Sequence, residues 1–240
     1  MSRWAKVYWC LLFMVVGVAV ISAILLSRSI KGPEYMSDVT NELDDSNMSV
    51  YYMNSSECNY FNRQDNEDVN YNSLDELEKK ASIIVRVKVE NERKMYLQAV
   101  KTKVKILEVY KGDLQKNRDI FIYEPSQLMC ISYSAYTCCG GYQLMQQDTE
   151  YILFLRNLDK PEGYSYRGDE EISYLPISCL YGKYSVKETE KKLTIISEDD
   201  ICNQKYTYSE ISQYPVLCTT EEELNSYKML LEQVKQKYIK

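Results

Sequence analysis

The stretch SIIVRVKVENERKMYLQAVKTKVKILEVYKGD, residues 82–113, decides the fold class of this 240-residue chain. In its first part, apolar and charged residues alternate: Ile83, Val85, Val87 and Val89 are interleaved with Arg86, Lys88 and Glu90. Such a period of two buries one face of a strand and leaves the other in water. The polar run NERK, residues 91–94, predicts a turn, and the alternation resumes over 95–110. The stretch therefore predicts a β-hairpin.

Further strand patterns follow the hairpin. RDIFIYEP predicts a third strand that Pro125 ends, and EYILFLRN, residues 150–157, predicts a fourth. Weaker patterns lie at 171–177, 182–186 and 192–196. Five to seven short antiparallel strands predict a mainly β domain built as a small barrel.

A helix is expected at each end of this domain. In SLDELEKKA, Ser73 and Glu76 have the spacing of a capping box and predict a short leading helix. From Thr220 onward, apolar residues recur every three or four positions, and Glu223 completes a second capping box. The sequence predicts an amphipathic C-terminal helix that packs on the same domain, which spans 73–240.

The N-terminal residues 1–31 have the composition of a membrane anchor. The run from Val7 to Leu26 contains no charged residue, and twenty helical residues span about 30 Å, the thickness of a bilayer's hydrocarbon layer. A transmembrane helix is predicted. Cleavage as a signal peptide, with secretion of the rest, is the alternative, but the apolar run is long for one and lacks a good cleavage site.

Residues 32–72 show no sustained period of 2 or 3.6 and are rich in Asn, Ser and Asp. They carry nine acidic residues against the single Arg63, a net charge of −8, whereas the whole chain carries −6. This composition predicts a disordered acidic stalk between the anchor and the domain.

Cysteines indicate the compartment. The chain has eight, and seven follow the apolar run: Cys58, Cys130, Cys138, Cys139, Cys179, Cys202 and Cys218. That density is typical of an oxidising exterior, so the domain is expected outside the cell on a single-pass anchor.

The adjacent Cys138 and Cys139 precede two glycines and a strand. A redox pair would instead show Cys-x-x-Cys at the start of a helix, and the spacings between the cysteines do not fit a zinc site. Disulfides are therefore expected among the six cysteines from Cys130 to Cys218, with fifteen possible pairings.

Cys58 is the odd cysteine because seven cannot all pair within one chain. It lies in the predicted stalk, where a second copy on the same membrane would bring another Cys58 close. One hypothesis is a homodimer linked through Cys58. The other is that Cys58 closes onto the barrel through Cys138 or Cys139, which leaves a different thiol unpaired.

The composition argues against most enzyme classes. The chain has no histidine, so Ser-His-Asp and Cys-His catalysis and histidine metal sites are absent. Acidic pairs lie in polar or helix-starting segments, and no glycine pattern for a nucleotide occurs. We expect no catalytic residue, cofactor, metal site or nucleic-acid partner. The prediction is a non-enzymatic extracellular module for an unknown protein or cell-wall partner; the alternative is a thiol redox protein that uses Cys138 or Cys139.

The order of the segments resembles the netrin-like domain, which occurs in tissue inhibitors of metalloproteinases and in many bacterial surface proteins. The resemblance runs from Ser73 to Val186 and rests on residues 80–90, 104–113, 120–124, 139–140, 150–155 and 178–179. It implies an OB-type barrel in which Cys139 pairs with Cys179. The animal inhibitors bind zinc through a free N-terminal cysteine, whereas an anchor and a stalk precede the domain here. A protease-inhibitor-like domain is therefore a further alternative for the function, but inhibition by that route would require cleavage immediately before Cys58.

Overall fold

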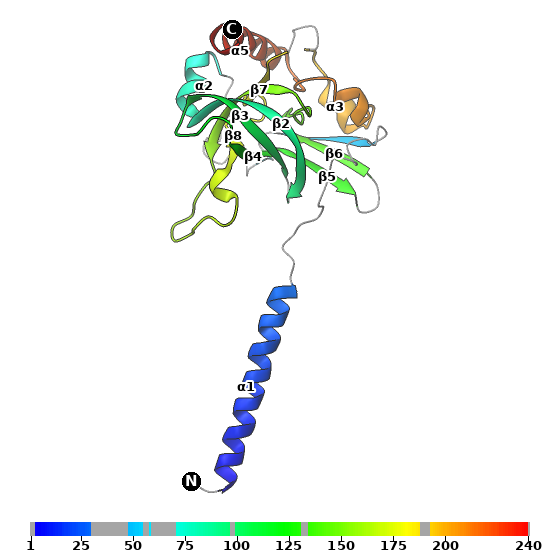
Figure 1. The fold of residues 1–240 in the computed structure, drawn as a ribbon. Coiled ribbons are helices and arrows are strands. Elements are labelled where there is room, and N and C mark those ends of the chain that lie inside the picture. Colours follow the sequence, from blue (N-terminus) through cyan, green and yellow to red (C-terminus); the bar gives the residue numbers. More distant parts are fainter. Residues whose placement is uncertain are drawn as a thin grey trace. The chain divides into compact units, whose positions relative to one another are not determined.

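A computed structural model describes residues 3–29, 48–54, 58, 71–96, 99–130, 134–187 and 193–239. The chain divides into two compact units, Met1–Glu34 and Tyr35–Lys240. The first unit contains the helix α1 (Arg3–Ser29) and the second contains all the strands (Figure 1).

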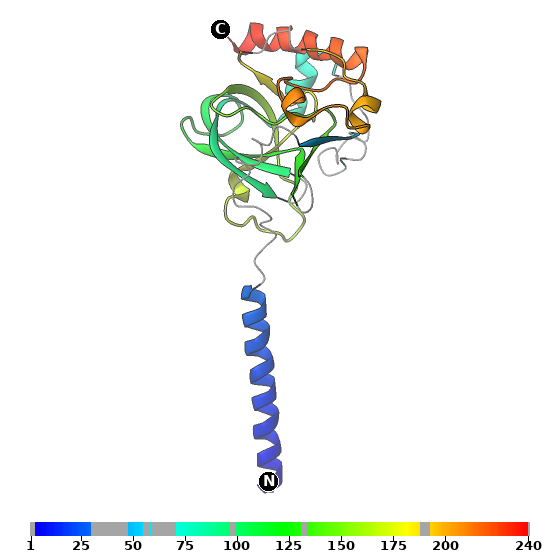
Figure 2. The same ribbon diagram turned by 90° about the vertical axis from the view of Figure 1, so that its right-hand side faces the viewer.

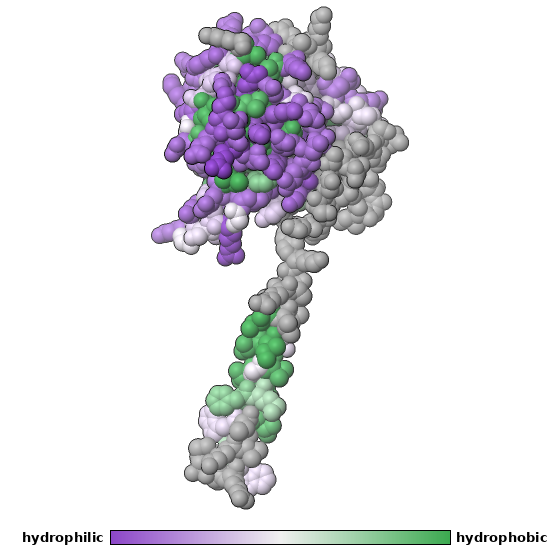
Figure 3. Space-filling view, in the orientation of Figure 1, coloured by the Kyte–Doolittle hydropathy of each residue, from purple (hydrophilic) through white to green (hydrophobic). Residues whose placement is uncertain are grey.

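Helix α1 presents apolar side chains to its surroundings. Phe13, Met14 and Val15 are each at least 65% exposed, and hydrophobic residues run along α1 in Figure 3. The visible face of the second unit is mainly hydrophilic. Over the described residues, no helix combines the length and the apolarity that a membrane span requires. The membrane span expected at Val7–Leu26 is not found among these residues.

The second unit is mainly β. Its elements in chain order are β1 (Ser49–Met53), α2 (Leu74–Lys80), β2 (Ile83–Tyr96), β3 (Ala99–Lys111), β4 (Asp119–Glu124), β5 (Ser126–Cys130), β6 (Ser134–Cys139), β7 (Glu150–Asn157), η1 (Glu170–Ile172), β8 (Ser173–Pro176), β9 (Lys183–Ser185), α3 (Glu198–Cys202), α4 (Tyr208–Ile211) and α5 (Glu221–Tyr238). The strands form two sheets.

The larger sheet has the order β2-β3-β4-β8-β7-β9, and β7 also pairs with β2. The pairs thus lead from β2 through β3, β4, β8 and β7 back to β2. Alternation divides the side chains of this ring between two clusters. Val85 and Val87 of β2 and Leu153 of β7 lie in one cluster, whereas Ile84 and Phe154 lie in another with residues of α2 and α5. Both faces of β2 and β7 are therefore covered in this region, which explains the almost continuous apolar run of EYILFLRN.

The helices α2 and α5 lie on the same side of the strands (Figures 1 and 2). Helix α5 begins with the predicted capping box: the Glu223 amide donates to Thr220 Oγ1 (3.2 Å), and the Thr220 amide donates to Glu223 Oε2 (3.1 Å). Within the predicted stripe, Tyr227, Leu231 and Val234 are fully buried, and so is the neighbouring Leu230. The expected core-packing role of this helix is confirmed.

The smaller sheet has the order β1-β6-β5. Strand β1 pairs with β6 in parallel, with Tyr52 opposite Cys138 and Met53 opposite Cys139. Met48 and Val50 are buried against residues of β6, α3 and α4. The structure differs here from the predicted stalk over 32–72, because residues 49–53 form a strand of the domain. The stalk residues 32–47, 55–57 and 59–70 lie outside the described part of the chain.

Three further expectations need correction. The hairpin turn is not at NERK: β2 continues to Tyr96, and a bulge places residues 90–92 opposite Lys103 alone. The pattern at 192–196 forms only an isolated bridge at Ile195 among its described residues. The sheets are also not wholly antiparallel, because β4 pairs with β8 in parallel, as β1 does with β6.

Candidate functional site

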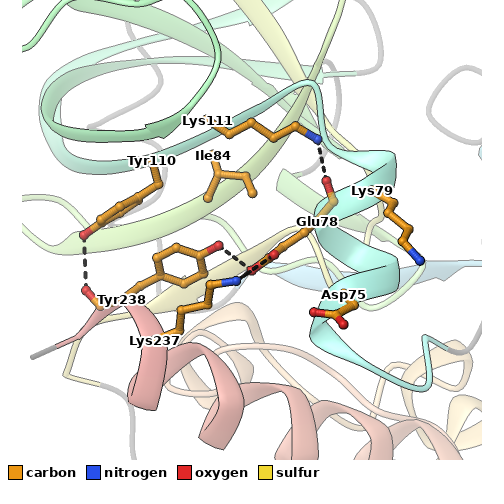
Figure 4. A pocket seen from close by; sticks show the side chains of 8 residues that line it. All are labelled: Asp75, Glu78, Lys79, Ile84, Tyr110, Lys111, Lys237 and Tyr238. Atoms are coloured by element: carbon orange, nitrogen blue, oxygen red, sulfur yellow. Dashed lines mark hydrogen bonds and ion pairs between the residues drawn. The ribbon is translucent and has the colours of Figure 1, made fainter.

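A pocket of about 610 Å³ lies where α2, the ends of β2 and β3, and α5 meet (Figure 4). Its lining residues are Asp75, Glu78, Lys79, Ile84, Tyr110, Lys111, Lys237 and Tyr238. Helix α2 supplies the first three, and the last turn of α5 supplies the last two. The pocket therefore joins residues that are up to 163 positions apart, counted from Asp75 to Tyr238.

Glu78 accepts hydrogen bonds from three other residues that line the pocket. Its carboxylate accepts hydrogen bonds from Lys237 Nζ at 2.6 and 2.8 Å and from the Tyr238 hydroxyl. Its backbone carbonyl accepts from Lys111 Nζ at 2.6 Å. This carbonyl lies in the last turn of α2, where helix carbonyls lack partners within the helix, so a cation is favourable there.

Tyr110 and Tyr238 form the aromatic wall of the pocket. The Tyr110 and Tyr238 rings are 4.7 Å apart between centroids and tilted by 52°, and the Tyr110 hydroxyl donates to the Tyr238 backbone carbonyl at 3.1 Å. Both hydroxyls are therefore engaged, which fixes the orientation of the rings.

The ionisation of the pocket follows from these contacts. Partial burial raises the pKa of Glu78, but the hydrogen bonds from Lys237 and Tyr238 outweigh it, so the pKa lies below its usual value. Burial, together with the Glu78 contact, raises the pKa of Tyr238. At neutral pH the pocket thus contains a carboxylate and a neutral phenol.

Asp75 and Lys79 differ from the other charged residues of the pocket. Figure 4 draws no hydrogen bond or ion pair from either side chain to the remaining lining residues. The pocket lining thus offers a charged group of each sign and aromatic surface, a combination that suits a ligand held by both ionic and aromatic contacts. The lining residues include neither a cysteine nor a serine that a base could activate as a nucleophile.

The Cys-Gly loop, residues 138–141, is held by backbone geometry. Gly140 and Gly141 have positive φ angles of 53° and 77°. The Leu217 amide donates to the Gly141 carbonyl at 2.9 Å, and a Cβ on Gly141 would lie 2.3 Å from the Leu217 carbonyl oxygen. The second glycine is therefore required by a close approach between two backbone segments.

The adjacent cysteines point to different clusters because they are neighbours in strand β6. Cys138 lies with Val50, Tyr136 and Ile201, whereas Cys139 lies with Cys58 and Cys179. The structure joins Cys58 to Cys139 in a disulfide with a Cα–Cα distance of 6.1 Å. This is the arrangement in which Cys58 closes onto the domain, and it differs from the pairing of Cys139 with Cys179 and from a leftover Cys58.

The other cysteines occupy separate places. Cys179 Sγ lies 4.0 Å from Cys139 Sγ. Cys218 is buried in the cluster that α5 covers, and Cys202 is exposed in α3. The side chain of Cys130 lies outside the described residues. Burial raises the pKa of Cys138 and raises that of Cys179 to about 12, so these thiols carry little thiolate at neutral pH.

A buried charge cluster supports the residues that follow the Cys-Gly loop. The Glu124 carboxylate is fully buried and accepts from the Tyr142 hydroxyl (3.0 Å), the Met145 amide (2.8 Å) and the Thr102 hydroxyl. Arg93 lies 3.8 Å from Glu124 and donates to the Met145 carbonyl. Both oxygens of the Glu124 carboxylate thus accept hydrogen bonds from protein groups, which tie Tyr142 and Met145 to β3 and β4. Among the described residues, no group of three or more potential ligands is arranged to hold a metal ion.

Little in the sequence indicates the pocket between α2, β3 and α5. Lys237 fits the charge preference of a helix C-terminus, Tyr238 fits the apolar stripe of α5, and Glu78 fits an exposed helix face. Comparison with protein-family models and with curated proteins finds no match to this chain, so the netrin-like resemblance stays a prediction.

Proposed function

We propose that this chain is a non-catalytic binding module of the cell exterior and that its ligand occupies the pocket between α2, β3 and α5. The observation that carries the proposal is the pocket itself, whose lining combines the paired rings of Tyr110 and Tyr238 with the charged side chains of Asp75 and Lys79. Pockets with apolar surface and a few placed polar groups are the usual sites of ligands.

The fold is consistent with this role. The closed ring of strand pairs supports a small OB-like barrel, and such a ring is a rigid base for a surface site. The absence of histidine from the sequence and the raised pKa values of Cys138 and Cys179 disfavour the alternative of a thiol redox enzyme.

The proposed location rests on two observations. The Cys58–Cys139 disulfide suits an oxidising compartment. The uncharged run Val7–Leu26 and the exposed apolar side chains of α1 support attachment to a membrane. Retention in the membrane fraction after an alkaline wash tests the attachment, and recovery of a soluble form that begins near Arg28 would show that the run is a cleaved signal peptide.

The binding test uses the full-length chain in mild detergent and two immobilised probes: purified cell-wall sacculi and the extracellular proteins of the producing cell. Wild type is compared with the double variant Asp75→Ala/Lys79→Ala and with a charge-matched control, Asp200→Ala/Lys205→Ala, whose ion pair is in α3 and the turn after it. We expect the pocket variant to lose at least about tenfold in affinity for one probe, about 1.4 kcal/mol. Equal binding by all three proteins, with unchanged unfolding curves, would refute the pocket as the site.

A further inference from the structure

Three sulfur atoms meet in one buried cluster of the domain. Cys58, Cys139 and Cys179 are 5%, 6% and 3% exposed, and they lie with Tyr142 and Leu175. Cys139 is bonded to Cys58, and its sulfur also lies 4.0 Å from that of Cys179. Cys139 is thus within reach of two alternative partners.

A disulfide between Cys139 and Cys179 could form after only a local movement. A disulfide has a sulfur–sulfur distance of about 2.05 Å, so Cys179 Sγ must approach by about 2 Å, a distance that side-chain rotation and a small backbone shift can supply. Cys138 is not an equivalent competitor, because its side chain leaves β6 on the opposite face and lies in another cluster.

We propose that Cys139 exchanges its disulfide partner between Cys58 and Cys179 by intramolecular thiol–disulfide exchange. Cys179 gives up its proton, and its sulfur attacks Cys139 Sγ. The Cys139–Cys179 bond forms while the Cys58–Cys139 bond breaks, and the electron pair of the broken bond leaves on the Cys58 sulfur, which takes up a proton. One disulfide and one thiol exist before and after the step, so no outside oxidant or reductant is consumed.

The exchange changes how β1 is held. In the described state a covalent bond ties Cys58 to the strand that β1 pairs with. After exchange, β1 depends on its ladder with β6 and on contacts such as the hydrogen bond from the Tyr208 amide to the Met48 carbonyl (2.9 Å). The disulfide then links β6 to the turn that contains Cys179, entirely within residues 73–240. The exchange therefore converts a covalent attachment of β1 into a non-covalent one.

The rate has a defined pH dependence. Burial raises the pKa of Cys179 to about 12, and the thiolate is the attacking species, so the rate rises about tenfold for each pH unit below that value. Exchange is therefore slow at neutral pH and about a hundredfold faster at about pH 9.

The test maps disulfides in the full-length protein by mass spectrometry, after acid quench and alkylation at intervals at about pH 7 and about pH 9. We expect a peptide pair joined through Cys139 and Cys179 to appear in wild type, about a hundredfold faster at the higher pH and at a rate independent of protein concentration. Cys179→Ser should keep Cys58–Cys139 alone, and Cys202→Ser, which removes an exposed thiol elsewhere, should behave as wild type.

A second experiment removes Cys58, so that only Cys179 is left as the partner of Cys139. Cys58→Ser, oxidised with glutathione disulfide, should form Cys139–Cys179. Wild type that retains Cys58–Cys139 as its only Cys139 linkage after prolonged incubation at about pH 9 would overturn the proposal. This outcome is read on wild type and does not depend on whether Cys58→Ser folds.

Discussion

Gly141→Ala is expected to be one of the most damaging single substitutions in this domain. Gly141 has φ +77°, and the left-handed region costs an alanine about 1–2 kcal/mol. The new Cβ would also lie 2.3 Å from the Leu217 carbonyl oxygen, so the two backbone segments must separate. That movement breaks the hydrogen bond from the Leu217 amide to the Gly141 carbonyl, which costs about 1–3 kcal/mol for a buried group. The free energy of unfolding should fall by about 2–5 kcal/mol in total.

Gly163→Ala provides a matched control. Gly163 has φ +78°, but nothing lies within 4 Å of its hypothetical Cβ. This variant should show only the backbone cost of about 1–2 kcal/mol. The measurement is urea-induced unfolding of both variants and wild type, followed by tyrosine circular dichroism. If the two variants agree within about 0.5 kcal/mol, the close approach to Leu217 contributes nothing and the reasoning is wrong.

Further substitutions, and reduction of the disulfide, probe other parts of the structure. Glu78→Gln should lower the free energy of unfolding at neutral pH by up to about 1 kcal/mol. Because the pKa of Glu78 is lowered in the folded state, its stabilisation is present above the unfolded pKa of 4.5 and is lost as the pH falls through the folded pKa. The unfolding curves of variant and wild type should therefore converge in acid. Glu124→Leu leaves Arg93 buried without its carboxylate and should cost about 3–5 kcal/mol, more than Glu124→Gln; equal costs in chemical denaturation would contradict an ionic role. Reduction of wild type should cost about 4.5 kcal/mol, from a cysteine separation of 81 residues. Oxidised Cys58→Ser should lose only about 0.6 kcal/mol if a Cys139–Cys179 bond over 40 residues replaces the missing one, and a loss as large as that on reduction would count against the replacement.

The sequence predicts best those elements whose pattern is strong over a short range. Strand β7 follows from its apolar run, the end of β4 from Pro125, and α5 from its stripe and capping box. The parallel pairing of β1 with β6 was not predicted, because SVYYM is short and lies among Asn and Ser residues, and its partner is about 86 positions away, counted from Ser49 to Ala135.

The candidate site was less predictable than the fold, for a physical reason. Glu78 and Lys237 are 159 positions apart and are each typical of an exposed helix surface. Only the packing of α5 beside α2 brings them together, and no local pattern carries that information. The cysteine pairing was unpredictable for a similar reason, because the spacing of the cysteines left fifteen pairings open. Only the structure shows that alternation along β6 places Cys138 and Cys139 on opposite faces of the strand.

The position of α5 has a consequence for synthesis of the protein. The ring strands emerge from the ribosome well before α5, which is the last helix in chain order. Until α5 arrives, the outer surface of the ring, including Ile84 and Phe154, lacks its cover. A nascent chain would therefore expose this apolar surface to chaperones or translocation factors for a defined interval. The surface becomes buried only after the final turns of α5 have been synthesised.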